Sequence, residues 1–452
     1  MKKYNITIVG AGSSRTPALI GSIVDYKNKF PIQKIIFYDI DLERMGKMQA
    51  YISLVLKKEM PELEFAFTNN KTIAYSDCDA VLVQMRAGNS EMRSKDEKIP
   101  LKYGLVGQET CGPGGFAYGM RSIPAMIEMV NDIRKVNKNA WILNYTNPAA
   151  IVALALDKVF PDDNKILNLC DQPYSMMRSF AKILNKNQAD LRCKYFGLNH
   201  FGWFTDIYDI NGNHYFEELK EYFKNHEFKP YNAEQRSQSW LETYKRVNKY
   251  LTFFPEYLPN TYLQYYFFPQ EIVEESNPLY TRSDEARDSR EKEIFELCTR
   301  AENEFTEDTV PLLKGSVFGN LMIEVALSIL ADLKDEFVLI TRNQGLIPNI
   351  SEDAMVELSG RLGANGLIVE PYGEVSTFYK GLIENQHAYE KLTVEACLEH
   401  DYTKALKALT LNRTVIDPQL ASKVLKDLEE ANKKYWTLQH EKKFNSQNNE
   451  EE

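Results

Sequence analysis

Residues 4–17, YNITIVGAGSSRTP, join a short apolar run to a glycine turn and the start of a helix pattern. Gly10 and Gly12 have the G-x-G spacing that lets backbone N–H groups approach a pyrophosphate at a helix N-terminus. Arg15 stands where the full fingerprint has its third glycine, so this spacing alone is weak evidence for a nucleotide. A tight turn that only joins a strand to a helix is the simpler alternative.

The sequence after the turn favours the nucleotide. A helix pattern leads to a second apolar run, KIIFYDID at 34–41, which contains Asp39 near its end. A carboxylate at this point of a strand–helix–strand unit binds ribose hydroxyls and favours NAD over its 2′-phosphorylated form. We therefore expect an NAD site formed by Gly10, Gly12, Ser13 and Asp39.

The first part of the chain continues to alternate between strand and helix patterns. The runs CDAVLVQM (78–85), AWILNYTN (140–147) and KILNLC (165–170) are hydrophobic on both faces, as are the buried strands of a parallel sheet. Their order with the intervening helices predicts an α/β fold. We expect a Rossmann-like, doubly wound parallel sheet over residues 1–190.

The pattern changes after about residue 190. The tripeptide Asn211-Gly212-Asn213 is a hairpin signal, and aromatic-rich, helix-leaning sequence follows it. Residues 318–333 predict a long helix and residues 336–345 an extended run, and the rest up to Trp436 is expected to be mostly helical. We expect an α+β domain over 191–440 and a polar tail over 441–452.

The composition is that of a globular protein. The chain has 452 residues, 44% of them hydrophobic and 26% charged. Its formal charge of −10 argues against nucleic acid or an anionic membrane as a partner, because both bind basic protein surfaces. We find no apolar stretch of about 18 residues, so we expect no membrane span. The six dispersed cysteines are typical of a reducing compartment, and we expect a cytoplasmic protein.

A cysteine and an aspartate stand side by side at the end of the run at 165–170. Cys170 and Asp171 belong to KILNLCDQPYS, and His200 follows in GLNHFGW. A thiolate and an imidazole suit a borderline divalent ion, although an unrelated cysteine and histidine are the commoner case at this spacing. A site with only two protein ligands would leave positions open for substrate and water, which suits catalysis.

Two further segments carry candidate chemistry. Residues 84–122 are rich in charge and glycine and begin at the carboxyl end of a strand, where open α/β sheets bind ligands. Their charged side chains include Arg86, Arg93, Glu109 and Arg121. Tyrosines 262, 265 and 266 cluster in LPNTYLQYYFFPQ (258–270). A solvated surface and an aromatic core are the ordinary alternatives for these two groups.

Six segments together identify a family resemblance. They are IPLKYGLVGQETCGPGGFAYGMRSI, AWILNYTNPAAIV, NLCDQP, YFGLNHFGW, LPNTYLQYY and SNPLYTR. Over residues 4–436 the chain resembles glycoside hydrolase family 4, the NAD- and manganese-dependent glycosidases. Within that family it is most similar to the 6-phospho-α-glucosidases.

The resemblance implies a role for each matching residue. Cys170 and His200 would bind Mn²⁺, and Asp171 would donate a proton to the leaving group. Tyr262 would remove the proton at C2, and Glu109 would tune this base. The remaining implied residues bind substrate: Arg93, Asn147 and Arg282, the arginines being suited to a 6-phosphate by their bidentate geometry.

The resemblance also implies the reaction. A 6-phospho-α-glucoside such as maltose 6′-phosphate would be oxidised at C3, deprotonated at C2, cleaved by elimination and completed by water addition. NAD would then act as a catalyst without net consumption. The resemblance further suggests a homodimer or homotetramer.

The cysteine motif bears on the anomeric preference. The α-type members carry Cys-Asp-Met-Pro and the β-type members Cys-Asn-x-Pro, whereas this chain has Cys-Asp-Gln-Pro at 170–173. Asp171 favours the α-type. Gln172 differs from the methionine of that type, and the sequence of the loop GAGSSRTPAL is more similar to the β-type, so a 6-phospho-β-glucosidase stays the alternative. Other classes also stay open: an NAD-dependent sugar dehydrogenase, in which Tyr262 or His200 moves a proton, and an NAD-binding sensor.

Overall fold

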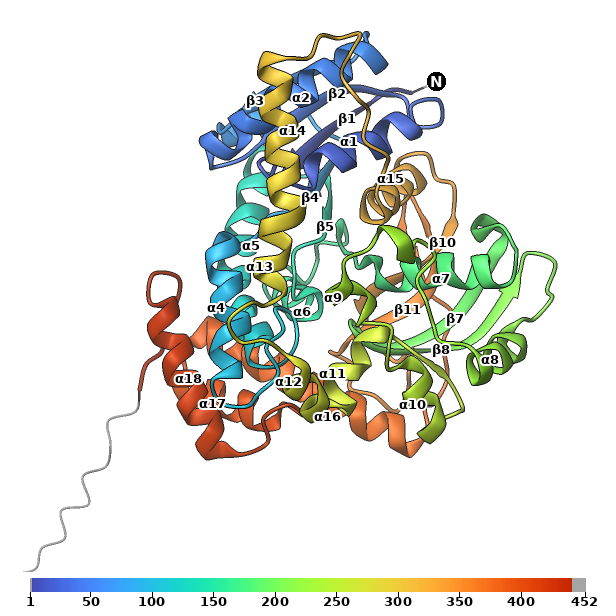
Figure 1. Cartoon of the computed structure of the whole chain (residues 1–452), viewed down its shortest axis with the longest axis vertical. Helices are drawn as coiled ribbons and strands as arrows, with labels where there is room; N and C mark the ends of the chain where they lie inside the picture. The colour runs from blue at the N-terminus through green and yellow to red at the C-terminus, as the bar shows by residue number, and fades with distance from the viewer. Residues whose placement is uncertain (1, 441–452) are drawn as a thin grey trace, which may run out of the picture.

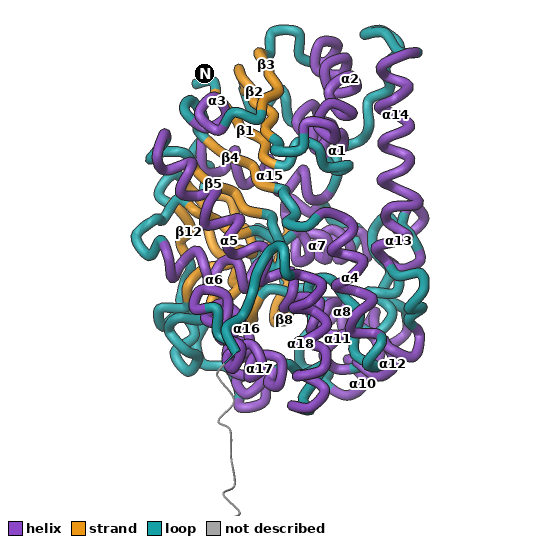
Figure 2. Tube along the Cα trace, turned by 90° about the vertical axis from the view of Figure 1, so that its left-hand side faces the viewer, coloured by secondary structure: helices purple, strands orange, loops and turns teal. Residues whose placement is uncertain are grey.

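The computed structural model describes residues 2–440, in which one long twisted sheet carries helices on both faces (Figures 1 and 2). The strands are β1 (Tyr4–Val9), β2 (Ile32–Tyr38), β3 (Glu64–Thr68), β4 (Ala80–Val83), β5 (Trp141–Asn144), β6 (Ile166–Asn168), β7 (Leu191–Leu198), β8 (Phe201–Asp209), β9 (Leu258–Pro259), β10 (Asp335–Arg342), β11 (Met355–Gly363) and β12 (Gly366–Ile368). The predicted polar tail at 441–452 lies outside the described residues.

The helices of the first half are α1 (Thr16–Asp25), α2 (Leu42–Glu59), α3 (Lys71–Tyr75), α4 (Asn89–Leu101), α5 (Gly112–Val136), α6 (Ala149–Val159) and α7 (Asp171–Ile183). Those that follow are α8 (Phe216–Asn225), α9 (Gln238–Leu241), α10 (Val247–Phe253), α11 (Gln264–Phe267), α12 (Pro269–Glu275), α13 (Arg282–Ala286), α14 (Lys292–Asn303), α15 (Val317–Leu330), α16 (Thr377–Glu399), α17 (Tyr402–Leu411) and α18 (Pro418–Asn432). Short 3-10 helices are η1 (Gln188–Asp190), η2 (Ala233–Gln235) and η3 (Thr261–Leu263), and η4 (Arg287–Glu291) is a π-helix.

The predicted doubly wound sheet is confirmed. Strands β3-β2-β1-β4-β5-β6 lie in this order and are parallel. Along β2, Ile35 and Phe37 join the core formed with α1, α2 and α15, whereas Ile36 and Tyr38 join the core formed with α3, α5 and α6. Because both faces are covered, these strands are apolar throughout, as the sequence showed.

The sheet continues beyond its parallel part. Ile340 of β10 pairs antiparallel with Asn168 of β6, and the order then runs β10-β11-β7-β8-β9. The hairpin signal is confirmed, because Asp209 and Asn213 are joined by a backbone hydrogen bond of 2.9 Å around Gly212. One sheet therefore spans both halves of the chain, and the domain division at residues 190 and 191 stays a prediction.

Two parts of the sheet differ from the expectation. Residues 355–368 lie in a region expected to be mostly helical, yet they form β11 and β12. β11 lies between β10 and β7, so both of its faces are largely buried and its sequence lacks the alternation that marks a half-exposed strand. The edge strand β3 also went unpredicted, because its short EFAFT run is only partly buried.

The buried Glu390 of α16 makes the stability of the fold depend on pH. It is 3% exposed and accepts a hydrogen bond of 2.8 Å from Gln386. Burial raises the pKa of Glu390 from 4.5 to about 8, so the folded chain keeps a proton that the unfolded chain releases. The free energy of unfolding therefore loses this contribution as the pH rises from 4.5 towards 8.

Glu390→Gln should remove this dependence, because the amide stays neutral at every pH. We expect the stability of the variant relative to the wild type to grow by roughly 1 kcal/mol per pH unit between pH 5 and pH 8. Urea unfolding of both proteins at several pH values measures the difference. A difference that stays constant with pH would contradict the assignment.

None of the described helices is both long and apolar enough to cross a membrane. All six cysteines are buried and free of disulfides within the described chain.

Candidate active site

The carboxyl ends of the parallel strands open into a large cavity. It has a volume of about 1490 Å³ and receives the segments that follow β1, β2, β4, β5 and β6. Ligands bind at this edge of an open α/β sheet. The sequence-predicted site residues all line the cavity: Gly10, Gly12, Ser13, Asp39, Arg93, Glu109, Asn147, Cys170, Asp171, His200, Tyr262 and Arg282.

The glycine turn after β1 has the geometry of a nucleotide cradle. Gly10 has φ +82°, and a Cβ there would come within 3.0 Å of the backbone nitrogen of Met85. The backbone N–H of Gly12 donates to Oδ2 of Asp39 over 2.7 Å, which joins the turn to the end of β2. Glycine therefore lets the turn pack closely against the segment that follows β4, and the turn lines the cavity where such turns bind a pyrophosphate.

Arg15, at the place of the missing third glycine, contributes a cation to this region. Its guanidinium lies 5.7 Å from the ring centroid of Tyr145 and 5.4 Å from that of Phe318. Burial acts to lower the pKa of Arg15, but the neighbouring Tyr145 and Asp171 outweigh it and the pKa is raised. The departure from the glycine fingerprint thus places a positive charge beside Asp171.

The two predicted metal ligands meet in space. Sγ of Cys170 lies 3.4 Å from Nε2 of His200, although Cys170 follows the parallel strand β6 and His200 lies between the antiparallel strands β7 and β8. Burial lowers the pKa of His200 to about 4, so the ring is neutral near pH 7 and has a lone pair for a cation. The described residues contain no group of three or more histidine, cysteine, aspartate or glutamate side chains around a common point.

The backbone explains how both side chains reach one point. β6 ends at Asn168, and Cys170 is the N-cap of α7, with Sγ accepting from the N–H of Gln172. Because the strand has ended, Cys170 and Asp171 need not point to opposite faces. His200 sits in the turn between β7 and β8 with φ +61°, a left-handed conformation that few non-glycine residues adopt.

Tyr262 lies directly against His200, one of the two predicted metal ligands. Its ring stacks on that of His200, with centroids 4.0 Å apart and an interplanar angle of 12°. Asn260 caps η3 by accepting from the N–H of Tyr262 over 3.0 Å. The amide of Gln172 on α7 donates to the hydroxyl of Thr261, so the helix that begins at Asp171 is tied to the turn that carries Tyr262.

Charges around Tyr262 act in opposite directions. Burial raises the pKa of Tyr262, the cation of Arg282 lowers it, and the negative charge of Glu109 raises it. Nη1 of Arg282 is buried without a hydrogen-bond partner among the described residues. Among the charges with the largest effect on the pKa of Tyr262, that of Arg282 is the one that favours a phenolate.

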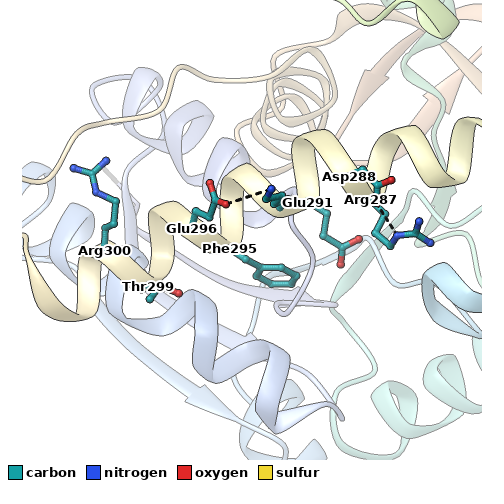
Figure 3. A pocket seen from close by; sticks show the side chains of 8 residues that line it. Arg287, Asp288, Glu291, Phe295, Glu296, Thr299 and Arg300 are labelled. Atoms are coloured by element: carbon teal, nitrogen blue, oxygen red, sulfur yellow. Dashed lines mark hydrogen bonds and ion pairs between the residues drawn. The ribbon is translucent and has the colours of Figure 1, made fainter.

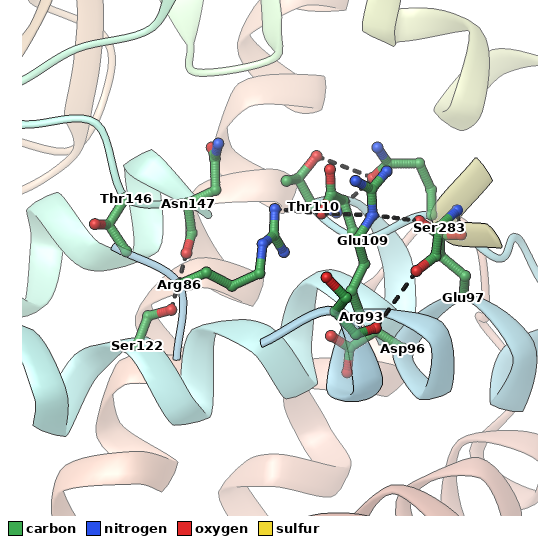
Figure 4. Close-up of polar contacts among 12 residues, drawn as sticks. Arg86, Arg93, Asp96, Glu97, Glu109, Thr110, Ser122, Thr146, Asn147 and Ser283 are labelled. Atoms are coloured by element: carbon green, nitrogen blue, oxygen red, sulfur yellow. Dashed lines mark hydrogen bonds and ion pairs between the residues drawn. The ribbon is translucent and has the colours of Figure 1, made fainter. Parts of the chain in front are cut away.

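Glu109 is held by arginines (Figure 4). Its Oε2 lies 2.6 Å from Nη2 of Arg86 and 3.1 Å from Nε of Arg93, and Arg93 also pairs with Glu97 at 2.9 Å. Although burial opposes it, these arginines lower the pKa of Glu109 to about 2 and keep the side chain ionised. Arg93 is thus shared between two carboxylates, whereas Arg282 is in no ion pair within the described chain.

Asn147 lines the cavity where β5 ends, and its carbonyl accepts from Ser122 Oγ over 2.9 Å (Figure 4).

A second, more open depression of about 850 Å³ lies along η4 and α14 (Figure 3). Its lining residues, from Arg287 to Arg300, include none of the sequence-predicted site residues. The candidate site is therefore the larger cavity.

Comparison with known proteins agrees with this geometry. The family model described as family 4 glycosyl hydrolase matches residues 5–186, and that of the family 4 C-terminal domain matches residues 195–415. The chain belongs to glycoside hydrolase family 4. The resemblance inferred from the sequence is thereby confirmed, and the protein is a glycoside hydrolase.

Relatives of this family 4 hydrolase match over nearly their whole length. Phospho-alpha-glucosidase PagL of Clostridium acetobutylicum is 44% identical over 97% of this chain and 100% of its own. The crystal structure of a 6-phospho-alpha-glucosidase from gut microorganisms with NAD and Mn²⁺ has a TM-score of 0.95 at 45% identity, covering 97% of this chain and 100% of that one. The NAD and glucose-6-phosphate complex of the 6-phospho-beta glucosidase from Thermotoga maritima has a TM-score of 0.83 at 28% identity, with 97% and 100% covered.

Some residues of this family 4 site carried no sequence signal. Arg290 of η4 lines the cavity, and its side chain is exposed. Restricted hydration and the neighbouring cations Arg15 and Arg93 lower the pKa of Arg290 to about 9. The buried Glu357 of β11 accepts from Asn199, the neighbour of His200, over 3.1 Å. Both belong to segments whose place beside the cavity depends on tertiary folding.

Proposed function

We propose that this enzyme is an NAD- and Mn²⁺-dependent 6-phospho-α-glucosidase that hydrolyses substrates such as maltose 6′-phosphate. The observation that carries the proposal is the meeting of four features in one cavity: a nucleotide turn, a Cys170–His200 pair, the proton-carrying side chains of Asp171 and Tyr262, and an Arg282 whose Nη1 has no hydrogen-bond partner among the described residues. The relatives with α-type names support the anomer, because they are 40–44% identical to this chain and those with β-type names 29%.

The residues fit both groups that the family implies. Cys170 and His200 offer a soft and a borderline donor 3.4 Å apart, a separation that one divalent ion can bridge. Gly10, Gly12, Ser13 and Asp39 would hold NAD. When bound, NAD supplies a reversible hydride acceptor and Mn²⁺ a Lewis acid.

The chain itself supplies the proton transfers. Asp171 follows Cys170 directly and would donate a proton to the departing glycosidic oxygen. Tyr262, stacked on His200, would remove the proton from C2 of the sugar. Arg282 lowers the pKa of this tyrosine, so we assign to Arg282 the tuning role that the resemblance gave to Glu109. Glu109 would instead hold Arg86 and Arg93 in place.

The cationic part of the cavity fits a phosphate. Arg282 has a buried N–H group without a hydrogen-bond partner among the described residues, and restricted hydration together with the cations Arg15 and Arg93 lowers the pKa of Arg290. An anion among Arg93, Arg282 and Arg290 would relieve this repulsion and accept the free donors. Asn147, at the end of β5, would bind sugar hydroxyls. Assembly as a homodimer or homotetramer stays a prediction.

The substrate panel that tests the proposal contains maltose 6′-phosphate, cellobiose 6′-phosphate and unphosphorylated maltose, each with Mn²⁺ and NAD⁺ added or withheld. We expect glucose 6-phosphate from maltose 6′-phosphate alone, only with both additions and without growth of absorbance at 340 nm. Cleavage of cellobiose 6′-phosphate instead would indicate the β-type enzyme. Stoichiometric NADH would indicate a sugar dehydrogenase.

The hydrogen bond between Gln172 and Thr261 should support the alignment of acid and base. Gln172→Met removes this donor, and we expect kcat on maltose 6′-phosphate to fall about five-fold, the value of one ordinary hydrogen bond. Thr261→Val should lose a similar amount. The double variant should lose no more than either single variant, since both remove one bond, and additive losses would contradict the coupling.

A further inference from the structure

The cavity extends past Asp171 to a wall that the reaction described above does not use. The wall consists of Ser175, Arg236 and Trp240, all of which line the same cavity as Asp171. Ser175 lies four residues after Asp171 on α7, which places both side chains on one face of the helix. Arg236 and Trp240 come from the connection between α8 and α10. The helix α7 therefore carries both Asp171, the proposed proton donor, and Ser175, the part of the wall next to it.

The wall is held in place by buried contacts. The Trp240 ring lies 4.7 Å from that of Tyr244, and the buried Tyr244 hydroxyl is 3.4 Å from Oγ of Ser175. The same connection is fixed to α7 further along, where the N–H of Tyr231 donates to Ser179 over 3.1 Å. Burial is the main cause of the raised pKa of Tyr244, and the charge of Asp171 adds to it.

The exposed groups of the wall suit a neutral sugar. The guanidinium of Arg236 lies 4.4 Å from the Trp240 ring centroid and donates to Asn232 over 2.9 Å. Trp240 is partly exposed, and its indole N–H makes no hydrogen bond within the described chain. An aromatic face packs against the C–H groups of a pyranose, while the indole and guanidinium groups bind its hydroxyls. A phosphate would instead bind at the cationic part of the cavity, which Arg93, Arg282 and Arg290 form.

We propose that this wall is the subsite for the leaving-group sugar, with Trp240 as its stacking platform and Arg236 as its hydrogen-bonding partner. The inference rests on the proposed function and goes beyond it. It assigns the enzyme to phosphorylated disaccharides, whose second ring fills the wall, in preference to small alkyl 6-phosphoglucosides. Asp171 would then protonate the oxygen that joins the two rings.

Trp240→Ala tests the subsite with two substrates that differ only in the leaving group. We expect kcat/KM on maltose 6′-phosphate to fall about 10-fold to 100-fold, whereas that on methyl α-glucoside 6-phosphate changes less than about two-fold. Trp240→Phe should recover most of the loss, because it keeps an aromatic face. Phe253→Ala, on the exposed α10 and outside the cavity, is the matched control and should leave both substrates unaffected.

Equal losses on both substrates, or no loss on either, would overturn the subsite while the proposed function stands. If the wild-type enzyme cleaves neither substrate with Mn²⁺ and NAD⁺ present, the proposed function fails and the subsite falls with it. A larger loss on maltose 6′-phosphate that Trp240→Phe does not recover would also overturn the stacking role.

Discussion

Replacing Tyr262 by phenylalanine should lower kcat on maltose 6′-phosphate by about 10²–10⁴-fold, the usual range for removal of a general base. The phenyl ring can keep the stacking contact with His200, whose centroid lies 4.0 Å away. The Cys170–His200 pair and the nucleotide turn should therefore be unaltered. Steady-state kinetics, with binding of Mn²⁺ and NAD⁺ measured separately by calorimetry, distinguishes loss of the base from loss of the site.

Tyr265→Phe is the matched control for this change. Tyr265 lies one helical turn further on and is buried next to Tyr262, but it does not line the cavity. We expect its loss in kcat to stay below about ten-fold, as for removal of an ordinary hydrogen bond. A Tyr262→Phe enzyme with near wild-type kcat would remove Tyr262 from the role of base.

Asp171→Asn should produce a loss that depends on the leaving group. The amide cannot donate the proton of a carboxylic acid, so kcat on maltose 6′-phosphate should fall by about 10²–10⁴-fold. An activated substrate, p-nitrophenyl α-glucoside 6-phosphate, needs little protonation of its leaving group and should lose less than about ten-fold. Release of glucose and of p-nitrophenol measures the two rates.

Equal losses of Asp171→Asn on the two substrates would exclude the acid role. In that case the carboxylate would act on its surroundings, for example through Arg15, whose pKa Asp171 helps to raise. Unchanged binding of Mn²⁺ in the variant is the required control, because Asp171 is next to Cys170 in sequence.

The parallel half of the fold could be predicted because its signals are local. Apolar runs such as β1 and β5 are buried on both faces, and the glycine turn at Gly10 marks a specific conformation. The chemistry of Cys170 and His200 suits a divalent ion and the family resemblance implies that they bind one, whereas their distance of 3.4 Å depends on a sheet that joins both halves of the chain. No spacing in the sequence could have given this distance.

The charges of the site were harder to predict. The sequence marks Arg93 and Arg282 alike, yet Arg93 is paired with Glu97 and Glu109 whereas Arg282 keeps a free N–H group. Glu97 lies only four residues from Arg93, but Glu109 lies sixteen residues away, so its pairing with Arg93 depends on the fold. Gln172 is an unusual residue at its place in the motif. Its hydrogen bond with Thr261 also joins residues that are far apart in the sequence, so the sequence could not predict it.

The most direct test of the account is the hydrolysis of maltose 6′-phosphate in D₂O, with the glucose 6-phosphate product examined by NMR and mass spectrometry. Removal of the C2 proton by Tyr262 and its replacement from solvent predict one deuterium bound to C2 of the product. Glucose 6-phosphate incubated with the enzyme under the same conditions serves as the control for later exchange. Normal turnover without deuterium at C2 would mean direct displacement at C1 and would contradict the account.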